Sequence, residues 1–172
     1  MHLLHLLRHA KSGRDEDVED RDRILSKRGR EAARAIGKGL PKAIGAVELV
    51  LCSSSARTRE TAELVLAAFD KPPRILFEDA LYLVGDGALL RRLRRLDEAC
   101  SSVLVIGHNP GLHQLAVALA APTSPEFKAL AEGKFPTTAR ASFRVDTNWA
   151  ALERGRNPLV AYVTPKSLDI ED

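Results

Sequence analysis

HLLHLLRHAKS, residues 2–12, is a short apolar run that ends in a basic pair, Arg8 and His9. The leucines predict a buried strand, and the basic pair marks the point where this strand opens into a loop. An arginine at such a point offers a planar fork of donors that suits phosphate. A histidine can act there as a nucleophile, or as an acid or base near neutral pH. The opening of the chain therefore predicts an anion site at the end of a core strand.

Two further motifs follow other apolar runs of the chain. SSSARTRET at residues 53–61 and GHNPG at residues 107–111 each come where an aliphatic run ends. In an open α/β sheet, ligands bind beyond the carboxyl ends of the strands. The order of the elements therefore predicts that Arg57 and His108 lie at the same sheet edge as the first motif.

Aliphatic runs alternate with stretches of helical spacing along the chain, which predicts an α/β protein. Strands are expected at 3–8, 47–52, 74–77, 103–107, 141–145 and 159–163. Helices are expected at 27–39, 57–69, 88–98, 111–120 and 126–132. Ser26 and Asp86 are expected to cap two of these helices, and Pro41 to end the first. Together the elements predict a three-layer α/β/α sandwich with a mostly parallel central sheet, formed by residues 1–172 as a single domain.

The composition is that of a globular protein, because 45% of the 172 residues are hydrophobic and 28% are charged. A formal net charge of +3 is too small to predict a nucleic-acid partner. The basic cluster RRLRR at residues 91–95 is expected to be a solvated helix face. No apolar run reaches the roughly 18 residues that would span a bilayer. The sequence therefore predicts neither a nucleic-acid partner nor a membrane partner.

The two cysteines, Cys52 and Cys100, lie beside apolar runs and do not form a Cys-x-x-Cys pair. This placement predicts free thiols in a reducing compartment. The N-terminal residues also lack the basic leader of a signal peptide. The expected location is therefore the cytoplasm.

The residue types at the three strand ends suit phosphoryl transfer. This reaction needs positive charge around three equatorial oxygens and a nucleophile in line with the leaving group. Arg8, Arg57 and His108 would supply the charge, and a neutral His9 would attack. Each motif alone is also explained as a turn or a helix cap, but their combination predicts a phosphate pocket.

The three motifs, together with DRILSKRG at 22–29 and FPTTA at 135–139, resemble the histidine phosphatase superfamily and its phosphoglycerate mutase-like fold. The resemblance covers nearly the whole chain. It is strongest to the small SixA-type phosphohistidine phosphatases, although Ile24 stands where proline is common. The resemblance implies a fold without a large cap subdomain.

The resemblance also implies roles for the residues at the strand ends. His9 would carry a transient phosphohistidine, and Arg8, Arg57 and His108 would bind the phosphoryl group. Neither a cofactor nor a metal is implied. Without a cap the pocket should be open, which suits a substrate presented on the surface of a signalling protein.

Other polar residues near the motifs are candidates for phosphate or substrate contacts. Lys11 and Ser12 follow the nucleophile, Arg23 lies in the 22–29 signature, and Asn109 lies in the third motif. Each is equally explained as an exposed loop residue that does not touch the substrate.

Many members of this superfamily place an acidic residue after the short middle strand, as the proton donor to an alcohol leaving group. Glu78 and Asp79 occupy this neighbourhood as possible general acids, and the sequence does not distinguish between them. Imidazole leaves phosphorus more easily than an alcohol, since its conjugate acid has a pKa of roughly 6.5. A weak or missing acid therefore favours phosphohistidine over a phosphate ester.

The leading interpretation is a metal-independent phosphatase that acts on phosphohistidine in a carrier or signalling protein. A phosphomonoesterase for small phosphorylated metabolites and a non-catalytic phosphate-binding module are the alternatives. A metal site built from His2, His5 and His9 is disfavoured, because a strand would hold His5 and His9 about 13 Å apart. The sequence leaves the oligomeric state open.

Overall fold

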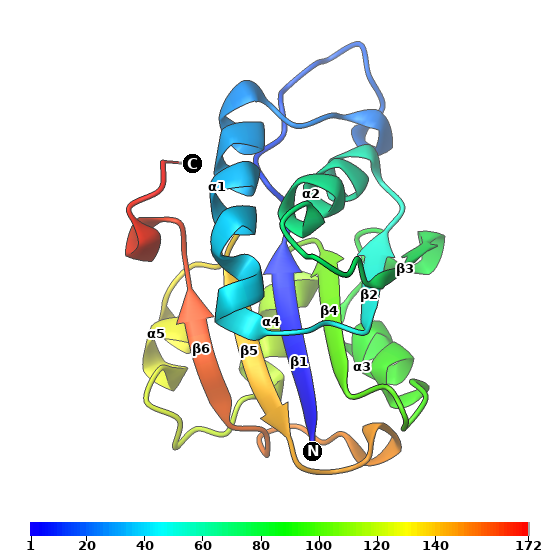
Figure 1. Ribbon diagram of the computed structural model, residues 1–172, viewed down its shortest axis with the longest axis vertical. Helices are drawn as coiled ribbons and strands as arrows, with labels where there is room; N and C mark the ends of the chain where they lie inside the picture. The colour runs from blue at the N-terminus through cyan, green and yellow to red at the C-terminus, as the bar shows by residue number, and fades with distance from the viewer. Residues whose placement is uncertain (172) are drawn as a thin grey trace.

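The computed structural model describes residues 1–171 and shows a six-stranded sheet covered by helices on both faces (Figure 1). The strands are β1 (His2–Arg8), β2 (Leu49–Ser53), β3 (Arg74–Glu78), β4 (Ser102–Gly107), β5 (Arg140–Val145) and β6 (Leu159–Val163). The helices are α1 (Lys27–Ile44), α2 (Ala56–Leu66), α3 (Asp86–Arg94), α4 (Gly111–Leu119) and α5 (Phe127–Glu132). The α/β sandwich predicted from the sequence is confirmed.

The strand order, β3-β2-β4-β1-β5-β6, brings the three motifs together. β1 pairs parallel with β4, and Arg8 lies opposite Gly107, so the first and third motifs leave the sheet side by side. β2 pairs parallel with β4 on its other side, whereas β5 runs antiparallel to β1 and to β6. Because β1, β4 and β2 are adjacent and parallel, their carboxyl ends meet at one edge of the sheet.

Two apolar cores hold the sheet between the helix layers. Leu4 and Leu6 of β1 pack with α3 and α4, whereas Leu7 packs with α1 and α2. All three side chains are fully buried, and burial of each contributes about 1.5–3 kcal/mol. Figure 1 shows α1 and α2 in front of the sheet and α4 behind it. β1 is therefore packed on both faces, which gives its polar end a defined position.

The start of α1 is fastened to the loop that follows His9. Ser26 caps the helix by accepting a hydrogen bond from the Gly29 N–H, and its own N–H and hydroxyl donate to the carbonyl oxygen of Lys11. A Cβ at Gly29 would lie 2.0 Å from this same carbonyl oxygen. The segment 22–29 thus holds the loop after His9 through a close backbone approach that only glycine permits.

Boundaries of three helices differ from the sequence expectation, and α2 ends at Leu66 rather than at 69. α1 passes through Pro41 and ends at Ile44, because Ile44 is buried and the Pro41 carbonyl still accepts a backbone hydrogen bond. Pro41 lacks only its own donor, so the prediction that it ends the helix is wrong. α3 ends at Arg94 rather than at 98, and Asp86 is its first residue, since Gly85 holds the cap position without a side-chain bond.

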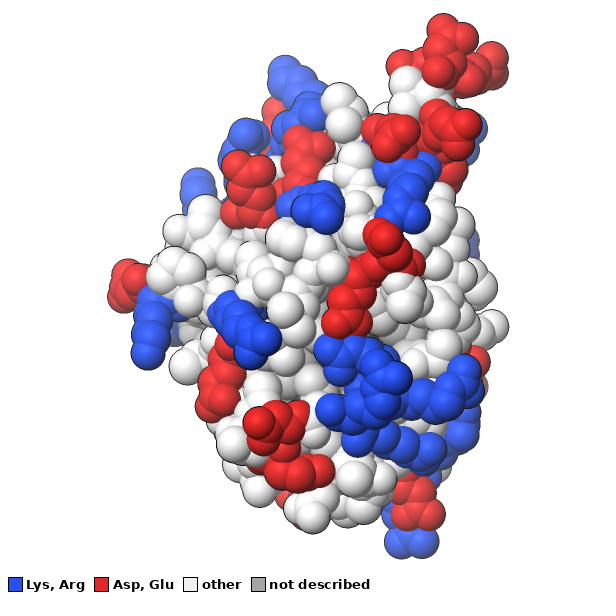
Figure 2. All heavy atoms as spheres, turned by 90° about the vertical axis from the view of Figure 1, so that its right-hand side faces the viewer, with Lys and Arg blue, Asp and Glu red and all other residues white. Residues whose placement is uncertain are grey.

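The basic cluster at 91–95 lies on α3, and Figure 2 shows Lys and Arg side chains gathered on this face of the molecule. Arg92 binds Glu78 through two hydrogen bonds of 2.8 Å, and Arg94 Nε donates to the Leu152 carbonyl at 2.9 Å. The other two arginines are exposed. The expected solvated face is therefore formed by Arg91 and Arg95 alone, whereas Arg92 and Arg94 are half-buried and hydrogen-bonded. Within residues 1–171, no helix has both the length and the apolar character needed to cross a membrane.

The two cysteines are free thiols in different surroundings. Cys52 is buried in β2, and Cys100 is half-buried before β4. Burial raises the pKa of Cys52 to about 12, which makes this thiol unreactive at neutral pH.

Gly29→Ala should destabilise the protein by about 1–3 kcal/mol, because the added methyl group collides with the Lys11 carbonyl. Gly39→Ala is the matched control in the same helix. A Cβ at Gly39 meets nothing within 4 Å, so this change should stabilise the protein slightly. Urea unfolding measures both free energies. Equal stability of Gly29→Ala and the wild type would contradict the close approach.

Candidate active site

His9 lies just beyond the carboxyl end of β1 and is buried, with 7% of its surface exposed. Its Nδ1–H donates to the carbonyl oxygen of Ala10 at 2.7 Å, which leaves the lone pair of Nε2 free. Burial lowers the pKa of His9 to about 3; the bond to Ala10 opposes this shift, and nearby His108, Arg8 and Arg57 add to it. At neutral pH the ring is therefore neutral and nucleophilic at Nε2.

Two threonines hold the backbone around His9. Thr61 of α2 accepts a hydrogen bond from the Ala10 N–H at 3.0 Å and donates to the Arg57 carbonyl at 2.7 Å. Thr138 donates its N–H to the carbonyl oxygens of His9 and of the residue before it, at 3.2 and 3.1 Å. These bonds tie the first motif to α2 and to the loop that precedes β5.

Arg8 is half-buried beside His9 and borders an open cavity of about 540 Å³. Its Nη1 donates to the Phe135 carbonyl at 3.2 Å, while its buried Nε has no hydrogen-bond partner within residues 1–171. Burial, and then the charge of Arg57, lowers the pKa of Arg8. An oxyanion would supply both an acceptor and the negative charge that this guanidinium lacks.

Two of the residues that the sequence predicts to contact the substrate line the cavity beside Arg8. Lys11 is exposed at its rim, and Asn109 lines it. Asn109 Nδ2 donates to the Phe135 carbonyl at 2.7 Å, and His113 stacks on the Phe135 ring. Lys11 and Asn109 thus line the same cavity as Arg8, to which Phe135 and His113 also contribute. Their contact with a substrate stays a prediction.

His108 follows β4 and lies against His9, with the ring centroids 5.3 Å apart. Its Nε2 shares a hydrogen bond of 2.8 Å with Ser53 Oγ, and its buried Nδ1 has no partner in the described part of the chain. Burial, and then the charge of Arg57, lowers the pKa of His108 to about 4. A phosphoryl dianion beside Nδ1 would reverse this shift and favour the imidazolium.

Arg57 lies in the first turn of α2, where Ser55 caps the helix by accepting a bond from the Thr58 N–H. The guanidinium is buried, with 4% of the residue exposed. Its Nη1 donates to the Asp20 carbonyl oxygen at 2.7 Å, and its Nη2 donates to the Asp20 carboxylate at 3.1 Å. Asp20 therefore occupies the donors that the sequence predicts for phosphate.

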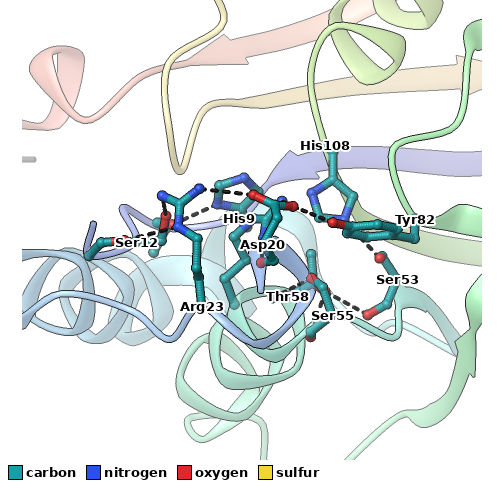
Figure 3. Close-up of polar contacts among 12 residues, drawn as sticks. His9, Ser12, Asp20, Arg23, Ser53, Ser55, Thr58, Tyr82 and His108 are labelled. Atoms are coloured by element: carbon teal, nitrogen blue, oxygen red, sulfur yellow. Dashed lines mark hydrogen bonds and ion pairs between the residues drawn. The ribbon is translucent and has the colours of Figure 1, made fainter. Parts of the chain in front are cut away.

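Asp20 is a site residue that the sequence reasoning missed, and it reaches the site from the 3₁₀ turn η1 (Asp20–Asp22). Figure 3 shows Asp20 and Tyr82 beside the two histidines. Tyr82 donates to the Asp20 carboxylate, and Arg23 Nη1 binds its other oxygen at 2.9 Å. The Tyr82 bond first, and then Arg57, lowers the pKa of Asp20 to about 2. In the sequence Asp20 is one of several acids in a charged loop, and only the fold places it on Arg57.

Ser12 and Arg23, two further predicted substrate contacts, bind each other. Arg23 Nη2 donates to Ser12 Oγ at 2.7 Å, and Arg23 Nε donates to the Gly13 carbonyl at 3.1 Å. Since Arg23 also holds the Asp20 carboxylate, it positions this side chain at the site (Figure 3). A direct contact of Ser12 or Arg23 with phosphate stays a prediction.

The two candidate general acids are both held by arginines. Glu78 binds Arg92, and its pKa is lowered chiefly by those hydrogen bonds. Asp79 binds Ser54 and Arg21, and the Ser54 bond first, then the Arg21 charge, lowers its pKa. Both groups are therefore ionised at neutral pH and hold no proton to donate. The identity of a general acid stays a prediction.

His2 and His5 do not join His9 in a metal site. His2 stacks on Trp149 with the ring centroids 4.5 Å apart, and His5 Nδ1 binds Ser142 Oγ at 2.7 Å. Across residues 1–171, no group of three His, Cys, Asp or Glu side chains is arranged to hold a metal ion.

Known proteins resemble this chain in sequence and in fold. A family model of the histidine phosphatase superfamily (branch 1) matches residues 4–81, which contain the first two motifs. An uncharacterized protein of Mycobacterium tuberculosis is 35% identical over 163 residues, which cover 93% of this chain and all of the relative. The structure of a candidate phosphohistidine phosphatase SixA from Nakamurella multipartitia has a TM-score of 0.81 and 31% identity, covering 95% of this chain and 96% of that one. The chain belongs to the histidine phosphatase superfamily.

A second SixA structure extends the comparison. It is a protein histidine phosphatase SixA in complex with tungstate, with a TM-score of 0.78 and 26% identity over 96% of this chain and 99% of that one. The resemblance read from the motifs is thereby confirmed. Membership of the superfamily supports a phosphatase.

Asp20→Asn should tighten the binding of tungstate or phosphate by about 3- to 10-fold. The change removes a negative charge that competes with the oxyanion for Arg57, while the amide oxygen can still accept from Tyr82. Asp22→Asn, exposed in the same turn, is the control and should leave the affinity unchanged. Calorimetric titration at constant ionic strength measures both. Weaker binding by Asp20→Asn would show that the carboxylate supports the oxyanion.

Proposed function

We propose that the protein removes phosphoryl groups from phosphohistidine on other proteins, through a covalent phosphohistidine on His9. The observation that carries this proposal is the state of His9, whose Nδ1–H is bound to the Ala10 carbonyl while Nε2 is free. A neutral imidazole nitrogen is competent to attack phosphorus. Arg8 and Arg57 lie around it as cations, and His108 would become an imidazolium when a phosphoryl dianion arrives beside it.

The reaction proceeds in two balanced steps. First, the substrate ring takes up a proton on the nitrogen that does not hold phosphorus. His9 Nε2 then bonds to phosphorus, and the P–N bond of the substrate breaks with its electron pair going to that ring, which leaves as neutral imidazole. Second, water attacks the phosphorus, the P–N bond to His9 breaks, and phosphate leaves with release of a proton that balances the one taken up. The Ala10 carbonyl holds the Nδ1 proton throughout, so each cycle ends with the same tautomer.

The charges of the site favour an imidazole leaving group. The carboxylate at the site, Asp20, has a pKa lowered to about 2, and Glu78 and Asp79 are ionised by their own partners. An alkoxide would need a proton from such a group, and general acid catalysis contributes roughly 10²–10⁴-fold in rate. Imidazole needs far less help, because its conjugate acid has a pKa of about 6.5.

The entrance to the site suits a substrate carried by a protein. Between α2 and β4 the chain forms only β3, the 3₁₀ turn η2 (Asp79–Leu81) and α3. None of the residues of these three elements lines the cavity beside Arg8. The cavity beside Arg8 is open and is rimmed by Lys11 and Lys134. A phosphohistidine that projects from the surface of a carrier or signalling domain would meet Arg8, the neighbour of His9, in this cavity without help from a metal ion.

The phosphohistidine of a carrier protein should be hydrolysed with a kcat/KM at least about 100-fold above those of sugar and nucleotide phosphates. The reason is that the site offers no proton donor to the alkoxide that leaves from an ester. Release of inorganic phosphate in the presence of a chelator measures each rate and keeps metal ions out. A preference for the esters would refute the substrate and leave a phosphomonoesterase. No turnover of any compound, with phosphate still bound, would identify a binding module.

His9→Ala should abolish turnover and retain affinity for tungstate, since the cationic groups remain. The wild type, quenched during turnover, should carry phosphate that is labile in acid and stable in base. His5→Gln changes a buried imidazole of the same strand outside the site and is the control that should keep its activity. Phosphoenzyme on His9→Ala, or unchanged turnover, would rule out the covalent mechanism.

A further inference from the structure

A second cavity, of about 470 Å³, lies on the α1 face of the sheet and shares no lining residue with the Arg8 cavity. Thr138, which binds the backbone of His9, lines the end of this cavity that is nearest to the active site. Its walls come from α1, from β5 and β6, and from the chain after β6. Figure 1 shows α1 in front of this half of the sheet, with the C-terminal segment beside it. Most of its lining is apolar, and Ile36, Leu40, Val163, Leu168 and Ile170 contribute to it. Its volume is in the range of pockets that hold small organic ligands, roughly 300–1,000 Å³.

One charged side chain, Arg140 of β5, lines this apolar cavity. The residue is more than nine-tenths buried, with 8% of its surface exposed. Its Nη1 donates to Ser142 Oγ, and within residues 1–171 it forms no ion pair with a carboxylate. Buried Arg57 and half-buried Arg92, in contrast, each bind one. A buried charge without a counter-charge is costly, so this guanidinium favours an anion in the cavity.

The neighbours of Arg140 do not neutralise its charge. Ser142 Oγ accepts from Arg140, so its single proton is directed to His5 Nδ1, 2.7 Å away. Burial, and then the charge of Arg140, lowers the pKa of His5 to about 4. The cluster therefore carries one net positive charge at neutral pH. Its only described polar partners are neutral groups.

The rim of the cavity on α1 is built from the small residues Ala35, Gly39 and Ala43. Gly39 has no packing reason to be glycine, because a Cβ there would meet nothing within 4 Å. Gly37 differs, since its Cβ would lie 2.7 Å from the Leu64 carbonyl oxygen. A glycine in a helix interior costs roughly 0.5–1 kcal/mol relative to alanine. The missing side chain at Gly39 leaves the mouth of the cavity open.

We propose that this cavity binds a small amphipathic carboxylate, an aliphatic acid whose carboxylate pairs with Arg140 and whose chain lies against Ile36, Leu40 and Val163. A guanidinium fork matches a single carboxylate, which it can bind through two parallel hydrogen bonds. The apolar walls suit an unbranched hydrocarbon chain. They do not suit a peptide, whose backbone N–H and carbonyl groups would be buried without partners.

Decanoate, kept below its micelle concentration, is the probe for a calorimetric titration of the full-length protein. It should bind with a 1:1 stoichiometry, and decanol, which has the chain without the charge, should bind at least about tenfold more weakly. Saturating phosphate fills the Arg8 site and should leave the decanoate affinity unchanged. Displacement of decanoate by phosphate would place it at the active site and overturn the proposal.

Two variants test the cavity from different sides. Arg140→Met removes the charge at similar size, and Gly39→Leu blocks the mouth while it leaves Arg140 in place. Each should weaken decanoate binding about tenfold or more. Arg144→Met is the matched control, because Arg144 lies on the same strand but is exposed and paired with Asp146.

Urea unfolding checks that each variant is folded. If Arg140→Met does not fold, the decanoate affinity of Gly39→Leu alone decides the test. No saturable binding of decanoate to the wild type would overturn the proposal. Equal affinity of the wild type and a folded Arg140→Met or Gly39→Leu variant would do the same, as would equal affinity for decanol.

Discussion

The hydrogen bond from His9 Nδ1 to the Ala10 carbonyl is the contact on which the proposed chemistry of this protein depends. It decides which ring nitrogen carries the proton and leaves the other one free. The bond holds only because the backbone around it is fixed. β1 is packed on both faces, Thr61 and Thr138 bind the backbone around His9, and Gly29 brings the start of α1 against Lys11. A short local contact thus rests on the packing of the whole sheet.

The site is complementary to a negative charge. Burial lowers the pKa of His9, Arg8 and His108 together, because positive charge is disfavoured where water is scarce. Asp20 supplies part of the counter-charge through Arg57, and an arriving phosphoryl group would supply the rest. The same physical rule applies to Arg140, whose buried charge has no carboxylate partner among the described residues.

Much of the fold was predictable from local signals. Aliphatic runs marked the six strands, and Ser26 marked the start of α1. The convergence of Arg8, Arg57 and His108 followed from the rule that parallel strands end at one edge. The prediction that Pro41 ends α1 was wrong. The free energy lost with one backbone donor in the last turn is smaller than the free energy gained by burying Ile44. No pattern in the sequence marked Asp20 and Tyr82 as site residues, since their positions depend on how two loops fold over the sheet edge.

The sequence by itself determined the elements, the sheet edge that carries the motifs, and the residue types available for phosphoryl transfer. These properties follow from periodicity and from the order of strands, which are local in the chain. The tertiary structure alone decided the tautomer of His9, the pairing of Arg57 with Asp20, and the isolation of Arg140 in an apolar cavity. Each of these depends on contacts between segments far apart in sequence, where burial and distance set the charge and the hydrogen-bond partner of every group.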